Sequence, residues 1–259
     1  MPHGLQPDPA AEIRNYYAAL YRAWGAQHWW PAETQFEVIV GAYLTQNTSW
    51  TNVEQAVANL RRANLLSVDG IRAARLSRLE RLIRPSGYFR QKAARLKTFV
   101  AFLDLHYAGS LPKLFSEPTE KLREELLSLN GVGPETADSI LLYAGNHPVF
   151  VVDAYTRRIL ERHQLIAADT TYEGIRRLFE QALAHLPEEP PEHAPSITGD
   201  SPHGSSHPPS RMSTARRTPT AQVFNEMHGL IVGIGKNYCK TSQPECERCP
   251  LRKFLPSAQ

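Results

Sequence analysis

The sequence contains few cysteines and no long apolar run. Only three of its 259 residues are cysteine, an odd number that argues against a disulfide framework and fits a reducing compartment. No stretch approaches the roughly 18 apolar residues of a membrane span, and Met1–Asp8 lacks the basic start and apolar core of a targeting segment. We therefore expect a cytoplasmic protein without a membrane partner.

The chain also carries little net charge. At +3, electrostatics alone would not identify a nucleic-acid-binding protein. Basic residues nevertheless cluster locally, because nine of them lie between Arg72 and Lys97 against a single acid, Glu80. Four arginines in this stretch recur every three residues: Arg72, Arg75, Arg78 and Arg81. Such a stripe suits either a surface that follows a phosphate backbone or an ordinary solvated helix face.

Patterns that indicate strands are nearly absent, whereas helical periodicity is widespread. With 42% hydrophobic residues, the chain can bury a sizeable core in one or two lobes. We predict an all-α fold. Helices are expected at Ala11–Trp24, Thr34–Asn47, Asn52–Ala63, Leu76–Ile83, Gln91–Tyr107, Thr119–Leu129, Glu135–Tyr143, Tyr155–His163, Tyr172–Leu186 and Thr220–Ile234.

One segment has little that could form a core. Residues 187–219 contain eight prolines and six serines with hardly any aliphatic side chain. A stretch of this composition cannot bury enough apolar surface to offset its ordering entropy. We therefore predict a disordered insertion at 187–219.

A glycine turn separates two of the expected helices. Gly131 and Gly133 permit positive φ and close backbone approach, and Pro134 suits the first position of the following helix. The amides of Gly131, Val132 and Gly133 would then point outward and form a seat for a phosphate that reads no base. The turn is either such a hairpin or an ordinary helix connection.

An acid opens a later helix. Residues 149–152 form a short extended run, and Asp153 follows at the expected N-cap of the next helix. A helix N-terminus favours the ionised carboxylate, which can stabilise a sugar oxocarbenium ion or orient an attacking water. Asp153 is thus a candidate catalyst as well as a capping residue.

These two features together resemble a known family. The pattern Leu-Asn-Gly-Val-Gly-Pro-x-Thr-Ala at 129–137, followed by Val-Val-Asp at 151–153, is similar to the helix–hairpin–helix (HhH-GPD) DNA glycosylase superfamily, in particular its endonuclease III-like branch. Upstream, the blocks at 29–31, 41–50 and 84–92 look most like the 3-methyladenine DNA glycosylases. Because several similar blocks occur in the same order as in the family, a chance similarity does not explain them.

The resemblance implies a two-lobed architecture. Residues 34–145 would form a helical barrel-like lobe with the hairpin, and residues 1–33 and 146–259 would form the second lobe, with a cysteine loop at 239–255. The DNA cleft would lie between the lobes. The partner would be double-stranded DNA containing damaged bases, bound by a monomeric enzyme of base excision repair.

One position bears on the reaction subclass. In bifunctional relatives, the second residue after the hairpin is a lysine that attacks the sugar and leads to strand cleavage. Here that residue is Glu135, which favours a monofunctional glycosylase in which Asp153 directs water. Glu135 would either shape the base pocket or complement the helix dipole. The alternatives are a bifunctional glycosylase and lyase acting on oxidised pyrimidines, and a non-catalytic DNA-binding protein.

The aromatic residues suggest a base pocket. By resemblance, Trp30 and Trp50 would sandwich the flipped base beside Pro31, whereas Trp29 is expected to fill the core. Stacked indoles favour a cationic alkylated purine such as 3-methyladenine. Gln46 is expected to fill the gap that the flipped nucleotide leaves in the duplex, although it also suits a polar helix end.

The three cysteines follow the spacing Cys239-x6-Cys246-x2-Cys249. In endonuclease III relatives a fourth cysteine completes a [4Fe–4S] site, and here the matching position is Leu255. Three outcomes stay open: a cluster with one ligand that is not cysteine, a degenerate loop without metal, or zinc held with a histidine such as His228.

Overall fold

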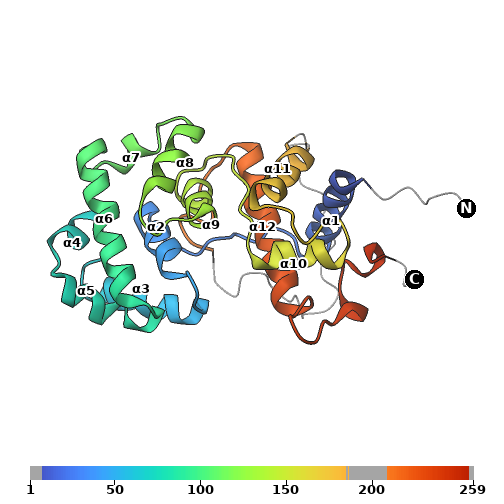
Figure 1. The fold of residues 1–259 in the computed structure, drawn as a ribbon, viewed down its shortest axis with the longest axis horizontal. Helices are drawn as coiled ribbons and strands as arrows, with labels where there is room; N and C mark the ends of the chain where they lie inside the picture. The colour runs from blue at the N-terminus through green and yellow to red at the C-terminus, as the bar shows by residue number, and fades with distance from the viewer. Residues whose placement is uncertain (1–7, 185, 187–208, 257–259) are drawn as a thin grey trace, which may run out of the picture. The chain divides into compact units, whose positions relative to one another are not determined.

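The computed structural model describes residues 8–184, 186 and 209–256, and within them the chain contains helices and turns but no strand (Figure 1). Two compact units are present. Unit 1 comprises Met1–Trp29, Pro148–Pro209 and Thr214–Gln259, and unit 2 comprises Trp30–His147 and Ser210–Ser213. Each unit is thus built from segments that lie far apart in the sequence. None of the described helices is long and apolar enough to cross a membrane.

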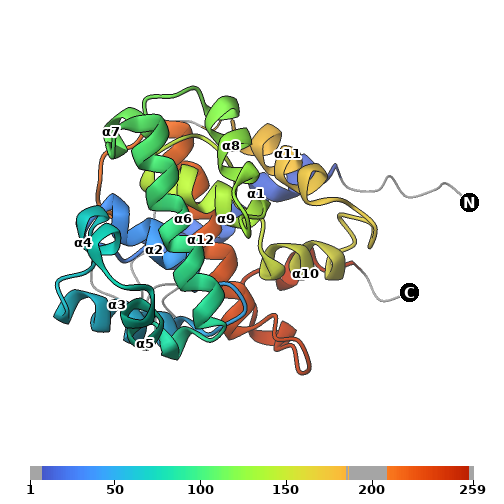
Figure 2. The same ribbon diagram turned by 60° about the vertical axis from the view of Figure 1, so that its left-hand side comes forward.

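Unit 2 is organised around one buried helix, α2 (Gln35–Leu44), in which every residue from Phe36 to Leu44 is buried. Thr34 caps α2 by accepting a hydrogen bond from the Glu37 N–H at 3.1 Å. Its other elements are α3 (Trp50–Arg62), α4 (Val68–Ala73), α5 (Leu76–Leu82), a 3-10 turn (Arg84–Ser86), α6 (Phe89–Tyr107), α7 (Leu111–Leu114), α8 (Thr119–Ser128), α9 (Pro134–Ser139) and a π-helical turn (Ile140–Ala144). Helices α3, α6 and α9 pack against α2, as Figure 2 shows from the side of α6.

Unit 1 is organised around α12 (Pro219–Asn237), which is buried along most of its length. Pro219 occupies its first turn, and Thr218 accepts a hydrogen bond from the Ala221 N–H at 3.3 Å. Helices α1 (Pro9–Trp24), α10 (Ala154–Arg162) and α11 (Tyr172–Leu183) pack on α12. Two 3-10 turns, Cys246–Arg248 and Arg252–Phe254, follow it.

The prediction of an all-helical chain is confirmed, and each of the ten expected helices is present with slightly different ends. Two short helices, α4 and α7, were not predicted because six and four residues are too few to display a helical period. The helix expected at Glu135–Tyr143 changes to a π-helical turn after Ser139.

The prediction that the disordered insertion extends to Pro219 is wrong for residues 209–219. Met212 is 8% exposed and its N–H donates to the Ala32 carbonyl at 2.9 Å, while the Ala32 N–H donates to the Ser210 hydroxyl at 3.0 Å. One apolar side chain and two paired backbone groups attach Ser210–Ser213 to unit 2, and Pro219 begins α12 of unit 1. Residues 187–208 lie outside the described part of the chain.

Candidate active site

The helix–hairpin–helix turn lies in unit 2 between α8 and α9. Gly131 has φ of +81°, and a Cβ added there would lie 1.9 Å from Nε of Arg95. The positive φ therefore favours glycine at this position, and a larger residue would also displace the flexible Arg95 side chain that covers it. Gly133 is the N-cap of α9 and Pro134 is its first residue, as the sequence predicted. Val132 is buried and anchors the turn.

Gln46 is held against this hairpin. Its Nε2 donates to the Gly131 carbonyl at 3.0 Å and to the Thr136 hydroxyl at 2.9 Å, and its Oε1 accepts from Arg95 Nη1 at 2.8 Å. Sequence reasoning expected Gln46 to fill a gap in the duplex. In this conformation its amide instead joins the end of α2 to the hairpin, so entering DNA would require these three hydrogen bonds to break.

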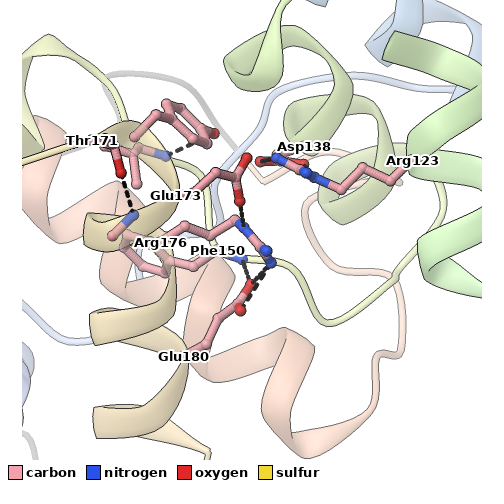
Figure 3. Close-up of polar contacts among 10 residues, drawn as sticks. Arg123, Asp138, Phe150, Thr171, Glu173, Arg176 and Glu180 are labelled. Carbon is pink, nitrogen blue, oxygen red and sulfur yellow. Dashed lines mark hydrogen bonds and ion pairs between the residues drawn. The ribbon is translucent and has the colours of Figure 1, made fainter. Parts of the chain in front are cut away.

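The hairpin helices are also tied together by a buried ion pair. Asp138 of α9 is fully buried and accepts from Arg123 of α8 at 2.7 and 3.1 Å (Figure 3). A buried carboxylate is tolerated when it is paired in this bidentate manner. Asp138 therefore fixes the angle at which α9 leaves the turn.

Three of the four residues predicted for the base pocket line one cavity of unit 2. Trp30, Pro31 and Trp50 border a space of about 270 Å³ together with side chains of α2 and α3. The indoles of Trp30 and Trp50 lie 5.1 Å apart at 87° to each other, edge to face. In this conformation the perpendicular rings leave no slot between them, and the role of the two rings in holding a base stays a prediction.

Trp30 belongs partly to the core. It is 6% exposed, and its ring lies 5.0 Å from that of Tyr143. A Cβ at Gly41 would come within 3.1 Å of the Trp30 ring, so the glycine leaves room for this indole. Trp30 thus forms the wall of the cavity, and the half-buried Trp50 is the more accessible ring.

The cavity carries acidic side chains. Glu37, Glu54 and Arg61 line it, and Glu37 forms an ion pair with Arg61. Burial raises the pKa of Glu37, and hydrogen bonding by the Glu33 N–H and Arg61 offsets this only in part. Two carboxyl groups against one guanidinium give the cavity an acidic lining.

Glu135 does not line this cavity. It is exposed in the first turn of α9, where an acid complements the helix dipole. Its predicted role in shaping the base pocket is not supported within unit 2, because the exposed end of α9 and the lining of the cavity are different surfaces.

Asp153 lies in unit 1 at the N-cap of α10, as predicted. Its Oδ1 accepts from the Thr156 N–H at 2.7 Å and from the Thr156 hydroxyl at 2.9 Å, and that hydroxyl accepts from the Asp153 N–H at 3.5 Å. Its Oδ2 lies 3.6 Å from Nε2 of His228. Burial raises the pKa of Asp153, but His228 and Thr156 outweigh it and hold the pKa below its ordinary value. Asp153 is thus a fixed, ionised carboxylate.

Helix α11 positions the extended run that leads to Asp153. The Phe150 N–H donates to Glu180 at 3.1 Å, and Arg176 holds the same carboxylate at 2.8 and 2.9 Å (Figure 3). The Val152 N–H donates to the Tyr172 hydroxyl at 3.3 Å. Side chains of α11 thus accept hydrogen bonds from backbone N–H groups of this extended run, which has no neighbouring strand among the described residues. The sequence does not predict these contacts.

Trp29 packs against His228, the residue that faces Asp153. Its indole meets the His228 ring edge to face at 6.2 Å, and Nζ of Lys236 lies 5.7 Å from its centre. The sequence predicts a core role for Trp29. A sequence pattern does not show which of two adjacent tryptophans is the more buried. His228 was considered only as a zinc ligand, whereas here it faces Asp153.

The three cysteines and Leu255 line one small pocket of unit 1, so Leu255 does occupy the place of the fourth ligand. A leucine cannot bind iron, and the described residues contain no group of three His, Cys, Asp or Glu side chains that could hold a metal ion. His163 borders the pocket, but its Nδ1 shares a hydrogen bond with the Tyr16 hydroxyl at 2.7 Å. The residues present do not fit a four-thiolate cluster or the proposed zinc site.

Arginines of α10 hold this cysteine loop. Arg158 donates to the carbonyls of Cys239 and Gly235 at 2.7 and 3.2 Å. Arg162 donates to Sγ of Cys239 at 3.3 Å and to the carbonyls of Lys240 and Thr241 at 2.6 and 2.8 Å. The loop is therefore fastened to the helix that Asp153 opens.

The arginine stripe is only partly available for phosphate. Arg72 pairs with Asp69 and Asp104. Arg75, Arg78 and Arg81 remain exposed on and beside α5. The predicted phosphate surface is thus reduced to these three residues.

Comparison with known proteins agrees with the fold and the hairpin. Residues 40–185 match the family model described as HhH-GPD superfamily base excision DNA repair protein. A provisionally named DNA repair glycosylase of Methanocaldococcus jannaschii is 38% identical over 243 residues, which cover 93% of this chain and 94% of that protein.

Two solved structures are similar. The 3-methyladenine DNA glycosylase of H. pylori, bound to 1,N6-ethenoadenine, has a TM-score of 0.65 and 26% identity, covering 88% of this chain and 96% of the other. A trapped covalent intermediate of endonuclease III with DNA has a TM-score of 0.69 and 20% identity, covering 95% and 94%. The extent of the family match and the archaeal relative are decisive, and this chain belongs to the HhH-GPD superfamily of base excision repair DNA glycosylases.

Proposed function

We propose that this DNA glycosylase is monofunctional and that Asp153 promotes hydrolysis of the bond between base and deoxyribose. The observation that carries the proposal is the carboxylate of Asp153, fixed by a capping box and kept ionised by His228 and Thr156. An anion held in this way stabilises the positive charge that develops on the sugar and orients the attacking water. The product is an abasic site.

The residue at the hairpin supports hydrolysis over lyase chemistry. The position that carries a lysine in bifunctional relatives is Glu135, exposed in the first turn of α9. A carboxylate cannot form the imine through which such enzymes cleave the strand.

We further propose that the preferred substrates are alkylated purines that carry positive charge, such as 3-methyladenine. The cavity bordered by Trp30 and Trp50 is aromatic and has an acidic lining, which suits a cationic ring. The positive charge also weakens the glycosidic bond, so no strong general acid is needed. The similar H. pylori enzyme is named for 3-methyladenine and was solved with an enlarged adenine.

Unit 2 presents a surface suited to duplex DNA. Lys92 donates to the carbonyls of Leu44 and Ser86 at 2.9 and 2.6 Å, which joins the end of α2 to the start of α6. There Tyr88 is 65% exposed with φ of +43°. An exposed aromatic ring at the start of α6, the helix whose Arg95 covers the hairpin, is suited to wedge between base pairs.

Excision assays test the proposal. Purified protein is expected to release 3-methyladenine from methylated DNA, and Asp153→Asn should lose release by several orders of magnitude while DNA binding is retained. Borohydride should trap no covalent adduct on abasic DNA, because an adduct needs an amine nucleophile. A trapped adduct would support the bifunctional alternative, and release by Asp153→Asn at the wild-type rate would remove Asp153 from the mechanism.

A further inference from the structure

The two carboxylate oxygens of Asp153 have different surroundings. Oδ1 accepts two hydrogen bonds from Thr156, at 2.7 and 2.9 Å. Because a carboxylate oxygen offers about two lone-pair sites, the capping box saturates Oδ1. Oδ2 has no contact with Thr156 among the described hydrogen bonds and faces His228 at 3.6 Å. Oδ2 is therefore the oxygen with capacity left for the sugar or for water.

His228 is fixed in its position beside Oδ2. It lies in the middle of α12, is 5% exposed, and meets the rings of Phe150 and Trp29 edge to face at 6.3 and 6.2 Å. These rings come from two segments that are distant in the sequence, and together they set the plane of the imidazole. The contact with Asp153 thus depends on the packing of α10 against α12.

We propose that His228 is a positioning residue for the reaction, which holds Oδ2 of Asp153 through the contact with its Nε2 and so aims it for hydrolysis. The inference rests on the proposed function in that Asp153 must be the reacting group. His228 itself does not touch the substrate in this scheme. Its effect reaches the reaction through the charge and orientation of Asp153.

Other charged groups around this pair are engaged elsewhere. On α12, Glu226 accepts from the Gln27 N–H and Lys236 lies over Trp29. On α10, Arg158 binds backbone carbonyls, and on α11 Glu180 binds Arg176 and the Phe150 N–H. Helix α1 places the hydroxyls of Tyr17 and Tyr21 near Glu226. In the described part of the chain, His228 and Thr156 are the side chains that lower the pKa of Asp153.

Removing His228 has a defined electrostatic consequence. Without His228, burial raises the pKa of Asp153 and only the donors of Thr156 lower it, so the pKa should increase. Since the ionised carboxylate is the active form, the acid limb of the excision rate should move to higher pH by the same amount. Packing defects alone would lower the rate without moving this limb.

The experiment compares three substitutions in the full chain. His228→Phe keeps a ring between Phe150 and Trp29 but removes both nitrogens, and His228→Gln keeps an amide donor without charge. His106→Phe is the matched control, because His106 is exposed on α6 in unit 2. The readouts are the carboxyl titration of Asp153 by carbon-13 NMR in DNA-free protein, assigned with Asp153→Asn, and the pH profile of single-turnover excision.

We expect His228→Phe to raise the pKa of Asp153 and to move the acid limb to higher pH, His228→Gln to do so to a smaller extent, and His106→Phe to change neither. The NMR titration needs no substrate, so it separates this inference from the proposed function. If the pKa of Asp153 rises but the protein releases no base from methylated DNA, the result would support the contact between His228 and Asp153 and refute the proposed alkylated-purine substrate. An unchanged pKa in folded His228→Phe or His228→Gln would overturn the inference even if Asp153 proves essential.

Discussion

Gly131→Ala should destabilise unit 2 far more than the same change at Gly133. At Gly131, alanine would have to adopt φ of +81°, which costs about 1–2 kcal/mol. Its methyl group would also collide with Arg95, whose Nε lies 1.9 Å from the Cβ position. Arg95 would then move and lose its hydrogen bond to Gln46, which costs about 1–2 kcal/mol for a half-exposed group.

The sum of about 2–4 kcal/mol should appear as a lower thermal midpoint. In a chain of this size, 1 kcal/mol corresponds to about 2–4 °C, so Gly131→Ala is expected to melt about 4–16 °C below wild type. Gly133 has φ of −95°, and no atom lies within 4 Å of an added Cβ. Gly133→Ala should therefore retain wild-type stability.

DNA binding by the folded proteins should show the opposite order of effects, with the larger loss at Gly133. A methyl group at Gly133 projects into the open space before α9, where a phosphate would approach, so Gly133→Ala should weaken binding to undamaged duplex without a loss of stability. Calorimetry and fluorescence anisotropy at fixed salt measure the two effects. Equal melting temperatures for the two variants would refute the assignment of Gly131 to a strained, covered position.

Three further outcomes are expected. Wild-type protein should contain no stoichiometric iron when purified. Leu255→Cys adds a fourth thiol to the pocket of Cys239, Cys246 and Cys249 and should increase the metal content. Elemental analysis of both proteins measures this difference. Arg162→Ala should expose the loop that follows Cys239 to limited proteolysis, with Arg252→Ala as the control on an exposed ion pair, and equal cleavage would contradict the clamp. Tyr88→Ala should reduce affinity for damaged duplex about tenfold at unchanged melting temperature, and unchanged affinity would exclude an intercalating role.

Local signals in the sequence predicted much of this molecule. The helices have clear periods, the capping position of Asp153 follows from an acid after an apolar run, and the glycine turn predicts the hairpin. These features depend on residues close together in the chain. Trp30, Pro31 and Trp50 were also grouped correctly, although only through resemblance.

The features that sequence reasoning missed depend on contacts between distant segments. His228 lies 75 positions after Asp153 in the numbering and carries no motif, so only the packing of α12 on α10 brings it to the carboxylate. The hydrogen bonds of Gln46 to the hairpin and of Met212 to Ala32 likewise join segments that are distant in the sequence. The perpendicular arrangement of Trp30 and Trp50 depends on rotamers, which a pattern does not specify.

In the proposed mechanism, the side chain of Asp153 links folding to catalysis because its two carboxylate oxygens have different roles. Oδ1 begins α10 through Thr156, a role that asparagine can also fill, since both residues are good N-caps. Oδ2 carries the charge beside His228, which asparagine cannot supply. Loss of activity in Asp153→Asn therefore reports on the charge, whereas Asp153→Ala would also remove a cap worth about 1 kcal/mol. The comparison of the two variants separates the oxygen that builds the helix from the oxygen that serves the reaction.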